Sequence, residues 1–320
     1  MAQVFAYLTH SNGVLDDAAL ELATAAKAIS SSPATAIVAG HGVDAVAASA
    51  ASIFEKVIKV DHAALSYPNA EVVRKALVAV IPQGSVVLFA HSTFSMDCAP
   101  GLSIKLGASF VADIVGIEGV EGSSLKVVRQ ELGGEVSTHV DVDISAGSVV
   151  AVRPGTFAPD EGKGAQGSVT DRSADLGDLS CERKFIEVQT PEAGDVDITK
   201  AEILISIGRG IEDEENIQLA MELKEAIGKG AEVSCSRPIV DAKWLEATRQ
   251  VGTSGCTVKP KVYLACGISG SFQHMGGIKG GYIVAINKNP NAPIFQVADV
   301  GVVANIVEFL PVLTEKIASL

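Results

Sequence analysis

The last quarter of the chain carries two apolar runs separated by a glycine-rich turn. The first run, residues 262–266, enters the small-residue turn 267–270, a polar Gln273-His274 pair follows, and the second run, 282–286, stops at 287–290. This order predicts strand, turn, helix start and strand, the layout of a nucleotide-binding α/β unit. Because glycine lacks a Cβ, backbone N–H groups and a helix N-terminus can approach a phosphate closely there. The segment lacks the G-x-G-x-x-G spacing, which disfavours an ordinary nicotinamide-dependent dehydrogenase.

Length and composition predict two α/β domains. A chain of 320 residues can bury two substantial cores, and we expect domains over residues 1–190 and 191–320. Aromatic residues make up only 5% of the chain, which is rich in alanine, valine, isoleucine and glycine. That composition suits parallel sheets covered by helices on both faces.

In the first domain, strand-like apolar runs alternate with Ala-rich helical segments as far as residue 106. The alternation predicts a mostly parallel, doubly wound sheet. Between residues 112 and 153 strand-like runs follow one another without intervening helices, at 126–131, 136–142 and 148–152. We expect these runs to form an antiparallel extension of the sheet.

A polar segment joins the domains. Residues 154–191 are rich in glycine, aspartate and serine, with a short strand-like run at 185–188. Such a composition cannot bury enough apolar surface for a core, and we place the crossing at residues 189–197. Beyond it, a second doubly wound unit is predicted, with strands at 203–207 and 233–236 and helices at 213–227 and 240–248.

Several classes of function are disfavoured. The formal net charge is −13 and no Lys/Arg stripe is present, so we expect no nucleic-acid partner. No apolar run reaches the roughly 18–20 residues of a membrane span, and the N-terminus has no signal-peptide pattern, so a bacterial cytoplasmic protein without stable membrane insertion is expected. Five scattered cysteines show no metal-ligand spacing and indicate reduced thiols: Cys98, Cys181, Cys235, Cys256 and Cys266.

Polar or glycine residues follow each strand of the second domain: Gly208-Arg209-Gly210, Ser236-Arg237-Pro238, Gly267-Ile268-Ser269-Gly270 and Asn287-Lys288-Asn289. In an open α/β sheet, these strand ends converge on one crevice, where ligands bind. Two arginines, hydroxyl groups, a histidine and free N–H groups suit a flat, anionic cofactor with a pyrophosphate. No G-x-S-x-G elbow or other nucleophile with a partnered base is present.

Four tracts of the second domain carry a family resemblance. They are S-R-P-I-V-D around Arg237, Q-V-G-T-S-G at 250–255, T-V-K-P-K-V-Y-L-A-C-G-I-S-G-S-F-Q-H, and V-A-I-N-K-N-P-N-A-P-I-F-Q-V-A-D; V-R-P-G-T-F at 152–157 adds to them. With these motifs the chain resembles the alpha (large) subunit of electron-transfer flavoprotein, densely over the last 120 residues or so and more loosely before them. The resemblance implies a heterodimer with a smaller beta subunit that carries AMP. It also implies one FAD, held mainly by the C-terminal domain, while the N-terminal domain pairs with the beta subunit and has no cofactor of its own.

The resemblance also implies roles for three residues that tune the flavin. Arg237 matches an arginine over the ring, where a permanent positive charge favours the anionic semiquinone. Ser254 matches a hydroxyl that donates toward flavin N5, although Thr253 replaces the glutamine usual before it. His274 matches a histidine near the flavin O2 edge. By residue type alone, Arg237 would form a surface ion pair, Ser254 would be a turn residue, and His274 would be a capping or core histidine.

The remaining contacts are implied by the same resemblance. Arg209 matches a phosphate-side arginine, and Gln273 and Ser269 would meet the ribityl chain and pyrophosphate. Asn305 stands where an acidic residue is common, near the adenosine end. The full expected FAD-binding set is Arg209, Ser236, Arg237, Gln250, Val251, Gly252, Thr253, Ser254, Gly267, Ser269, Gly270, Ser271, Phe272, Gln273, His274, Asn287, Asn305 and Ile306.

The function implied by the resemblance is that of an electron carrier without an organic substrate of its own. Its FAD would accept electrons singly from a flavin-containing dehydrogenase and pass them to a downstream, quinone-linked acceptor. Three alternatives stay open: a subunit of an electron-bifurcating flavoprotein, an FAD- or NAD-dependent oxidoreductase acting on a small substrate, and a non-redox module that binds an adenine nucleotide.

Overall fold

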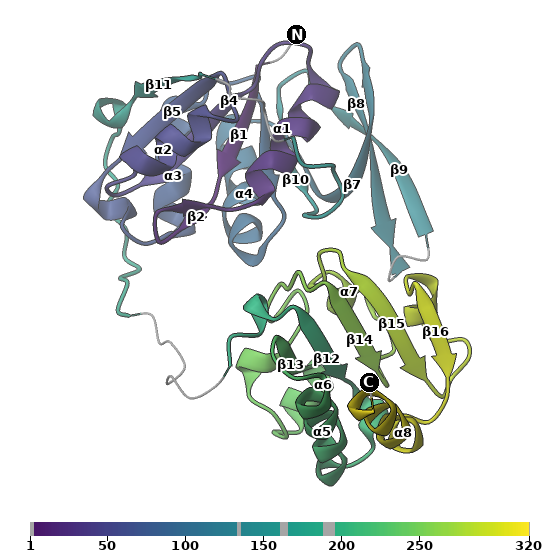
Figure 1. Cartoon of the computed structure of the whole chain (residues 1–320). Helices are drawn as coiled ribbons and strands as arrows, with labels where there is room; N and C mark the ends of the chain where they lie inside the picture. Colours follow the sequence, from purple (N-terminus) through teal and green to yellow (C-terminus); the bar gives the residue numbers. More distant parts are fainter. Residues whose placement is uncertain (1–2, 133–135, 161–165, 188–195, 320) are drawn as a thin grey trace. The chain divides into compact units, whose positions relative to one another are not determined.

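The computed structural model describes residues 3–132, 136–160, 166–187 and 196–319. The chain divides into two compact units, Met1–Glu187 and Val188–Leu320, each built around its own sheet (Figure 1). A mixed sheet in the first unit and a parallel sheet in the second confirm the predicted fold class. None of the helices in the described ranges combines the length and the apolar character that a bilayer span requires.

The first unit contains a nine-stranded sheet in the order β11-β5-β4-β1-β6-β10-β7-β8-β9. Neighbours from β11 to β7 pair in parallel, whereas β7, β8 and β9 pair antiparallel. In sheet order the strands are Ser168–Asp171, Lys56–Asp61, Thr35–Gly40, Val4–Leu8, Val86–Ala90, Ser148–Val152, Ser109–Glu121, Ser124–Glu131 and Val136–Asp143. A small hairpin pairs β2 (His10–Ser11) with β3 (Val14–Leu15).

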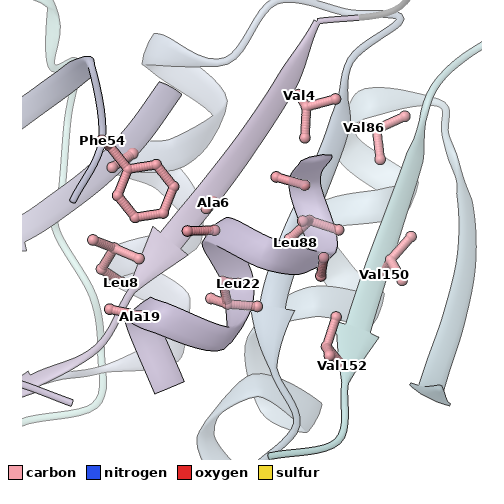
Figure 2. Packing of buried hydrophobic residues seen from close by; sticks show 14 of the residues in the cluster. Val4, Ala6, Leu8, Ala19, Leu22, Phe54, Val86, Leu88, Val150 and Val152 are labelled. Carbon is pink, nitrogen blue, oxygen red and sulfur yellow. The ribbon is translucent and has the colours of Figure 1, made fainter. Parts of the chain in front are cut away.

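Helices cover both faces of this sheet because its strands are apolar on both sides. Ala6 of β1 packs in one cluster with residues of α1 (Ala18–Ile29) and α2 (Asp44–Ala51), as Figure 2 shows for α1. Tyr7 points the other way, toward α3 (Ala70–Val80) and α4 (Thr93–Leu106). The alternation results from the two-residue period of a strand, and each buried large aliphatic side chain contributes about 1.5–3 kcal/mol.

Strand β10 corrects one sequence expectation. The sequence pattern places residues 148–152 in the antiparallel extension, yet β10 pairs in parallel with both β6 and β7 at the centre of the sheet. All five of its residues are buried, which is typical of a central parallel strand. The antiparallel extension therefore consists of β7, β8 and β9.

The polar connecting segment holds one strand that apolar patterning does not reveal. All four residues of β11 are exposed, and this edge strand exists because its backbone pairs with β5. The strand-like run expected at 185–188 is absent over 185–187, where Phe185 stacks on Tyr67 with ring centroids 4.4 Å apart. Residue 188 and most of the expected crossing at 189–197 lie outside the described residues.

The second unit contains a five-stranded, wholly parallel sheet in the order β13-β12-β14-β15-β16. In sheet order the strands are Ala231–Cys235, Ile203–Ile207, Val262–Cys266, Tyr282–Asn287 and Val300–Val303. The first strand along the chain, β12, lies between the second and the third. The direction of winding therefore reverses between β12 and β14, which is the topological switch point where such sheets bind ligands.

One face of this sheet is covered by α5 (Ile217–Ile227) and α8 (Ile306–Ala318), which share a core with β12 and β14. The opposite face packs against the segments around Val251 and Val258 and against a 3-10 helix, Pro293–Gln296, that contains Ile294. Two short helices, α6 (Arg237–Asp241) and α7 (Phe272–Met275), lie in the connections that follow β13 and β14. The helix expected at 240–248 is wrong: Pro238 in the first turn favours an earlier start, and Lys243 follows with a left-handed φ of 62°.

Candidate functional site

A cavity of about 680 Å³ lies in the second unit, at the carboxyl ends of the strands. Its volume is in the range of about 300–1,000 Å³ that is usual for small-molecule sites. The lining residues are Arg209, Gly210, Ser236, Arg237, Pro238, Asp241, Gln250, Val251, Gly252, Thr253, Ser254, Gly267, Ile268, Ser269, Ser271, Gln273, His274, Asn287, Lys288, Asn289, Asn305 and Ile306.

The floor of the cavity is made by two glycine turns that touch at the switch point. Gly210 donates its N–H to the Gly267 carbonyl at 3.1 Å, and a Cβ on Gly267 would lie 2.6 Å from the Gly210 Cα. Gly267 also has φ +65°, a conformation that side chains disfavour. Only glycine lets the loops after β12 and β14 meet here, so the cavity is lined by backbone at this point.

A second loop brings residues 250–256 against the start of α7. The Thr253 N–H donates to the Gln273 carbonyl at 2.8 Å, and Cys256 N–H donates to the Gln250 carbonyl at 2.7 Å. The Thr253 side chain lies over Gly276, where a Cβ would come within 2.7 Å of Thr253 Cγ2. These contacts place Ser254 and His274 on adjoining walls of one cavity.

The Ser254 hydroxyl has a defined neighbour. Gln250 donates through Nε2 to Ser254 Oγ at 2.9 Å. A serine hydroxyl has one proton and two lone pairs, so this contact uses a lone pair and leaves the O–H to donate elsewhere. Ser254 is exposed on this chain and lines the cavity, so its proton is available to a ligand.

His274 is buried and neutral. Only 5% of the residue is exposed, and burial lowers the pKa of the imidazole to about 4, an effect that the Val251 carbonyl partly opposes. Its Nε2 lies 2.7 Å from the Tyr263 hydroxyl. Within the described residues its Nδ1 is buried without a hydrogen-bond partner, which is costly unless a ligand supplies one.

Positive charge predominates around the cavity. Arg209, Arg237 and Lys288 line it together with a single carboxylate, Asp241. The Arg237 side chain is 69% exposed and its Nε lies 3.4 Å from Asp241 Oδ2, four residues on. An exposed pair of this kind contributes at most about 1 kcal/mol, so the guanidinium can exchange Asp241 for an anionic ligand at little cost.

Two asparagines of the expected set make local bonds. Asn287 donates through Nδ2 to the Ile268 carbonyl at 2.9 Å and accepts from the Asn289 N–H at 2.9 Å, which holds the loops after β14 and β15 together. Asn305 caps α8 by accepting from the Val307 N–H at 3.0 Å. The asparagine thus serves as a helix cap beside the cavity.

The structure brings sixteen of the eighteen expected binding residues to the wall of this one cavity. Gly270 and Phe272 are not among its lining residues. A Cβ on Gly270 would lie 2.3 Å from Ile294 N, so this glycine allows close backbone packing, and Phe272 is 45% exposed at the first position of α7. Six lining residues stand outside the expected FAD-binding set. Five of them lie in the strand-end tracts that were expected to converge on the crevice: Gly210, Pro238, Ile268, Lys288 and Asn289. Only Asp241 was missed by sequence reasoning, and it lies four residues after Arg237.

The part of the chain that the structure describes contains no cluster of three or more His, Cys, Asp or Glu side chains able to hold a metal ion. The usable groups are instead backbone N–H groups, hydroxyls, cationic side chains and one unpartnered imidazole nitrogen. Such a donor set suits the binding of a large anionic molecule.

Comparison with known proteins connects this geometry with a family. Residues 197–279 match the electron transfer flavoprotein FAD-binding domain, and residues 4–176 match the electron transfer flavoprotein domain. The chain is 33% identical to the electron transfer flavoprotein subunit alpha of Methylophilus methylotrophus, with all of both chains covered. It is 31% identical to the subunit of that name from Thermoanaerobacterium thermosaccharolyticum, over 99% of this chain and 98% of the relative. Protein FixB of Clostridium saccharobutylicum is 32% identical over 87% of this chain and 84% of its own length.

Proposed function

The chain belongs to the electron transfer flavoprotein alpha-subunit family, and from that premise we propose that its second unit holds one FAD in the cavity at the strand ends. We further propose that the protein carries electrons between partner proteins and has no organic substrate of its own. The observation that carries the proposal is the presence of Arg237, Ser254 and His274 around one cavity.

The donor set of the cavity fits FAD. The glycine floor at Gly210 and Gly267 lets backbone approach a pyrophosphate closely, and Arg209 adds positive charge on the same side of the sheet. Ser269 and Gln273 supply polar groups for the ribityl chain. After β16, Asn305 caps α8 and Ile306 is the first residue of that helix. This start of α8 lines the cavity and would meet the adenosine end of FAD.

When bound, FAD supplies reversible one-electron redox chemistry, and the residues at the ring set how readily that chemistry occurs. Arg237 brings a charge that persists at every working pH, so it favours a ring that becomes negative. With FAD bound, Ser254 would donate its hydroxyl proton toward N5, because Gln250 occupies only a lone pair of that oxygen. His274 is neutral and can offer Nδ1 to the O2 edge without adding a full charge.

We propose a beta subunit as the obligate partner, with AMP in that subunit and the first unit of this chain, about residues 1–190, as its docking domain. The naming of the relatives as subunits supports this arrangement. The exposure of Thr253, Ser254 and Arg237 supports it too, because a second protein surface would close the cavity over them. A flavin-containing dehydrogenase would be the donor, and a quinone-linked protein the downstream acceptor.

The test uses the complex purified after co-expression with its beta subunit. We expect one FAD per heterodimer, reduction by a flavin-containing dehydrogenase with its substrate, and no turnover of small organic substrates by the complex alone. Two flavins per heterodimer together with NADH oxidation would favour the bifurcating alternative. A complex that lacks flavin and cannot be reconstituted with FAD would refute the proposal.

A further inference from the structure

A fully buried tyrosine, Tyr263, contacts the histidine that lines the cavity. Tyr263 lies in β14, between β12 and β15, and is 0% exposed. Its hydroxyl is 2.7 Å from His274 Nε2, and the two rings are tilted by 55°. Tyr263 itself does not line the cavity, so any influence on a ligand has to pass through His274.

We propose that Tyr263 is a positioning residue: its hydroxyl donates to His274 Nε2, which keeps the imidazole proton on Nδ1, where it can donate a hydrogen bond to the ligand in the cavity. This inference rests on the proposed FAD site. It assigns a role to Tyr263, a residue that does not line the cavity and therefore would not contact the flavin itself.

The direction of the hydrogen bond is set by the protonation states of the two groups. Burial raises the pKa of the Tyr263 phenol far above neutrality, so the hydroxyl keeps its proton. A neutral imidazole has one N–H and one bare nitrogen, and the bare nitrogen is the acceptor that a phenol requires. The other arrangement, with Nε2 as donor, would leave a buried lone pair on Nδ1 with no donor among the described residues.

Two neighbours favour the same direction. The Val251 carbonyl lies near the imidazole and raises its pKa, the effect of an acceptor beside a ring N–H, although it makes no hydrogen bond of ordinary geometry with Nδ1. Because Nε2 is engaged by the phenol, the N–H that this carbonyl favours is on Nδ1, where it remains able to donate to a ligand. The second neighbour is the buried Ser206 hydroxyl on β12, near the Tyr263 oxygen. It lowers the pKa of the phenol, which is the effect of a donor to that oxygen. The contact falls short of ordinary hydrogen-bond geometry.

A purely structural role for the bond makes a different prediction, since a buried tyrosine hydroxyl needs a partner whatever that partner does. Removal of the hydroxyl separates the two roles. If the bond only satisfies Tyr263, the tautomer of His274 and the potential of a bound flavin stay as they were. If Tyr263 sets the proton of His274, both change.

The first measurement needs no flavin. In the full-length chain, nitrogen-15 NMR of the His274 ring distinguishes a protonated Nδ1 from a protonated Nε2. We expect Nδ1–H in the wild type and a mixture containing Nε2–H in Tyr263→Phe, which removes only the hydroxyl from a buried ring. The matched control is Tyr7→Phe, a tyrosine that is 3% exposed in β1 of the other unit, which should leave the His274 signals unchanged.

The second measurement uses the complex reconstituted with FAD. We expect Tyr263→Phe to weaken binding of the reduced flavin relative to the oxidised flavin about tenfold, which lowers the first reduction potential by about 59 mV. In a His274→Asn background the amide N–H is present whatever residue occupies position 263. There Tyr263→Phe should change the potential no further, which tests the coupling of the two residues.

Nε2–H in the wild-type chain would overturn the inference, and so would an unchanged potential in Tyr263→Phe. A double-variant effect equal to the sum of the single effects would also overturn it, because it would show that Tyr263 acts independently of His274. Failure of the chain to bind FAD while the NMR result holds would refute the proposed function and leave the assignment of the His274 proton in place.

Discussion

Gln250 donates to the Ser254 hydroxyl across 2.9 Å, and by using a lone pair of that oxygen it leaves the serine proton to point elsewhere. The bond is local, because the loop folds back so that Cys256 N–H meets the Gln250 carbonyl. By residue type alone, Ser254 would be assigned to a simple turn. In the structure its hydroxyl is fixed by Gln250 at the cavity wall, with its proton available to a ligand.

Ser254→Ala should lower the first one-electron potential of bound FAD, since it removes a donor to a ring that gains negative charge. Hydrogen bonds to charged groups are worth about 1.5–3 kcal/mol, so a tenfold or larger shift in the one-electron equilibrium is expected. Potentiometric titration of the complex measures it. Ser254→Thr keeps the hydroxyl and should retain most of the potential, whereas equal potentials in wild type and Ser254→Ala would leave Ser254 as a turn residue.

Arg237→Ala should retain FAD but lower the first potential, because the variant loses the fixed positive charge at the ring. Asp241→Ala is the matched control, since it breaks the same ion pair and keeps the guanidinium. We expect that variant to hold or raise the potential. If both variants lowered it equally, Arg237 would act only through Asp241. Neither change should destabilise the fold by more than about 1 kcal/mol.

The stability of the chain should depend on His274 below neutral pH. Its folded-state pKa of about 4 lies under the ordinary value of 6.5, so the unfolded chain binds more protons between these two values. The contribution of His274 to the free energy of unfolding is therefore fully present above pH 6.5. It is lost as the pH falls from 6.5 to about 4, and the loss is roughly 3 kcal/mol at most. Urea unfolding from pH 4 to 7 should show a shallower pH dependence for His274→Gln than for the wild type. Parallel curves would contradict the assignment.

Gly267→Ala should destabilise the second unit and abolish FAD retention. The added Cβ meets the Gly210 Cα at 2.6 Å and also occupies a left-handed conformation. Gly280→Ala provides the control, because Gly280 has φ +81° and nothing within 4 Å of its Cβ position. In urea unfolding we expect Gly280→Ala to lower the free energy of unfolding by about 1 kcal/mol, from backbone strain alone. Gly267→Ala should lower it by more. Equal losses would show that the contact between the two turns matters little.

Much of the second unit could be predicted because its signals are local. β14 begins and ends at the expected residues, since an apolar run bounded by lysine and glycine has few other structures to adopt. The convergence of Arg209, Ser236 and Gly267 could be predicted from a rule of topology, because parallel strands bring their carboxyl ends to one edge. The exposed strand β11 gave no such signal, because backbone pairing at an edge leaves no pattern of buried side chains.

The sequence by itself therefore determined the α/β class, the family and the strand ends that form the site, because buried runs and glycine turns are encoded residue by residue. The tertiary structure alone decided that β10 lies inside the parallel sheet, that Asp241 faces Arg237, and that Tyr263 holds the ring of His274. These relationships depend on which strand lies beside which and on where a side chain points, and such contacts form only when the chain is folded.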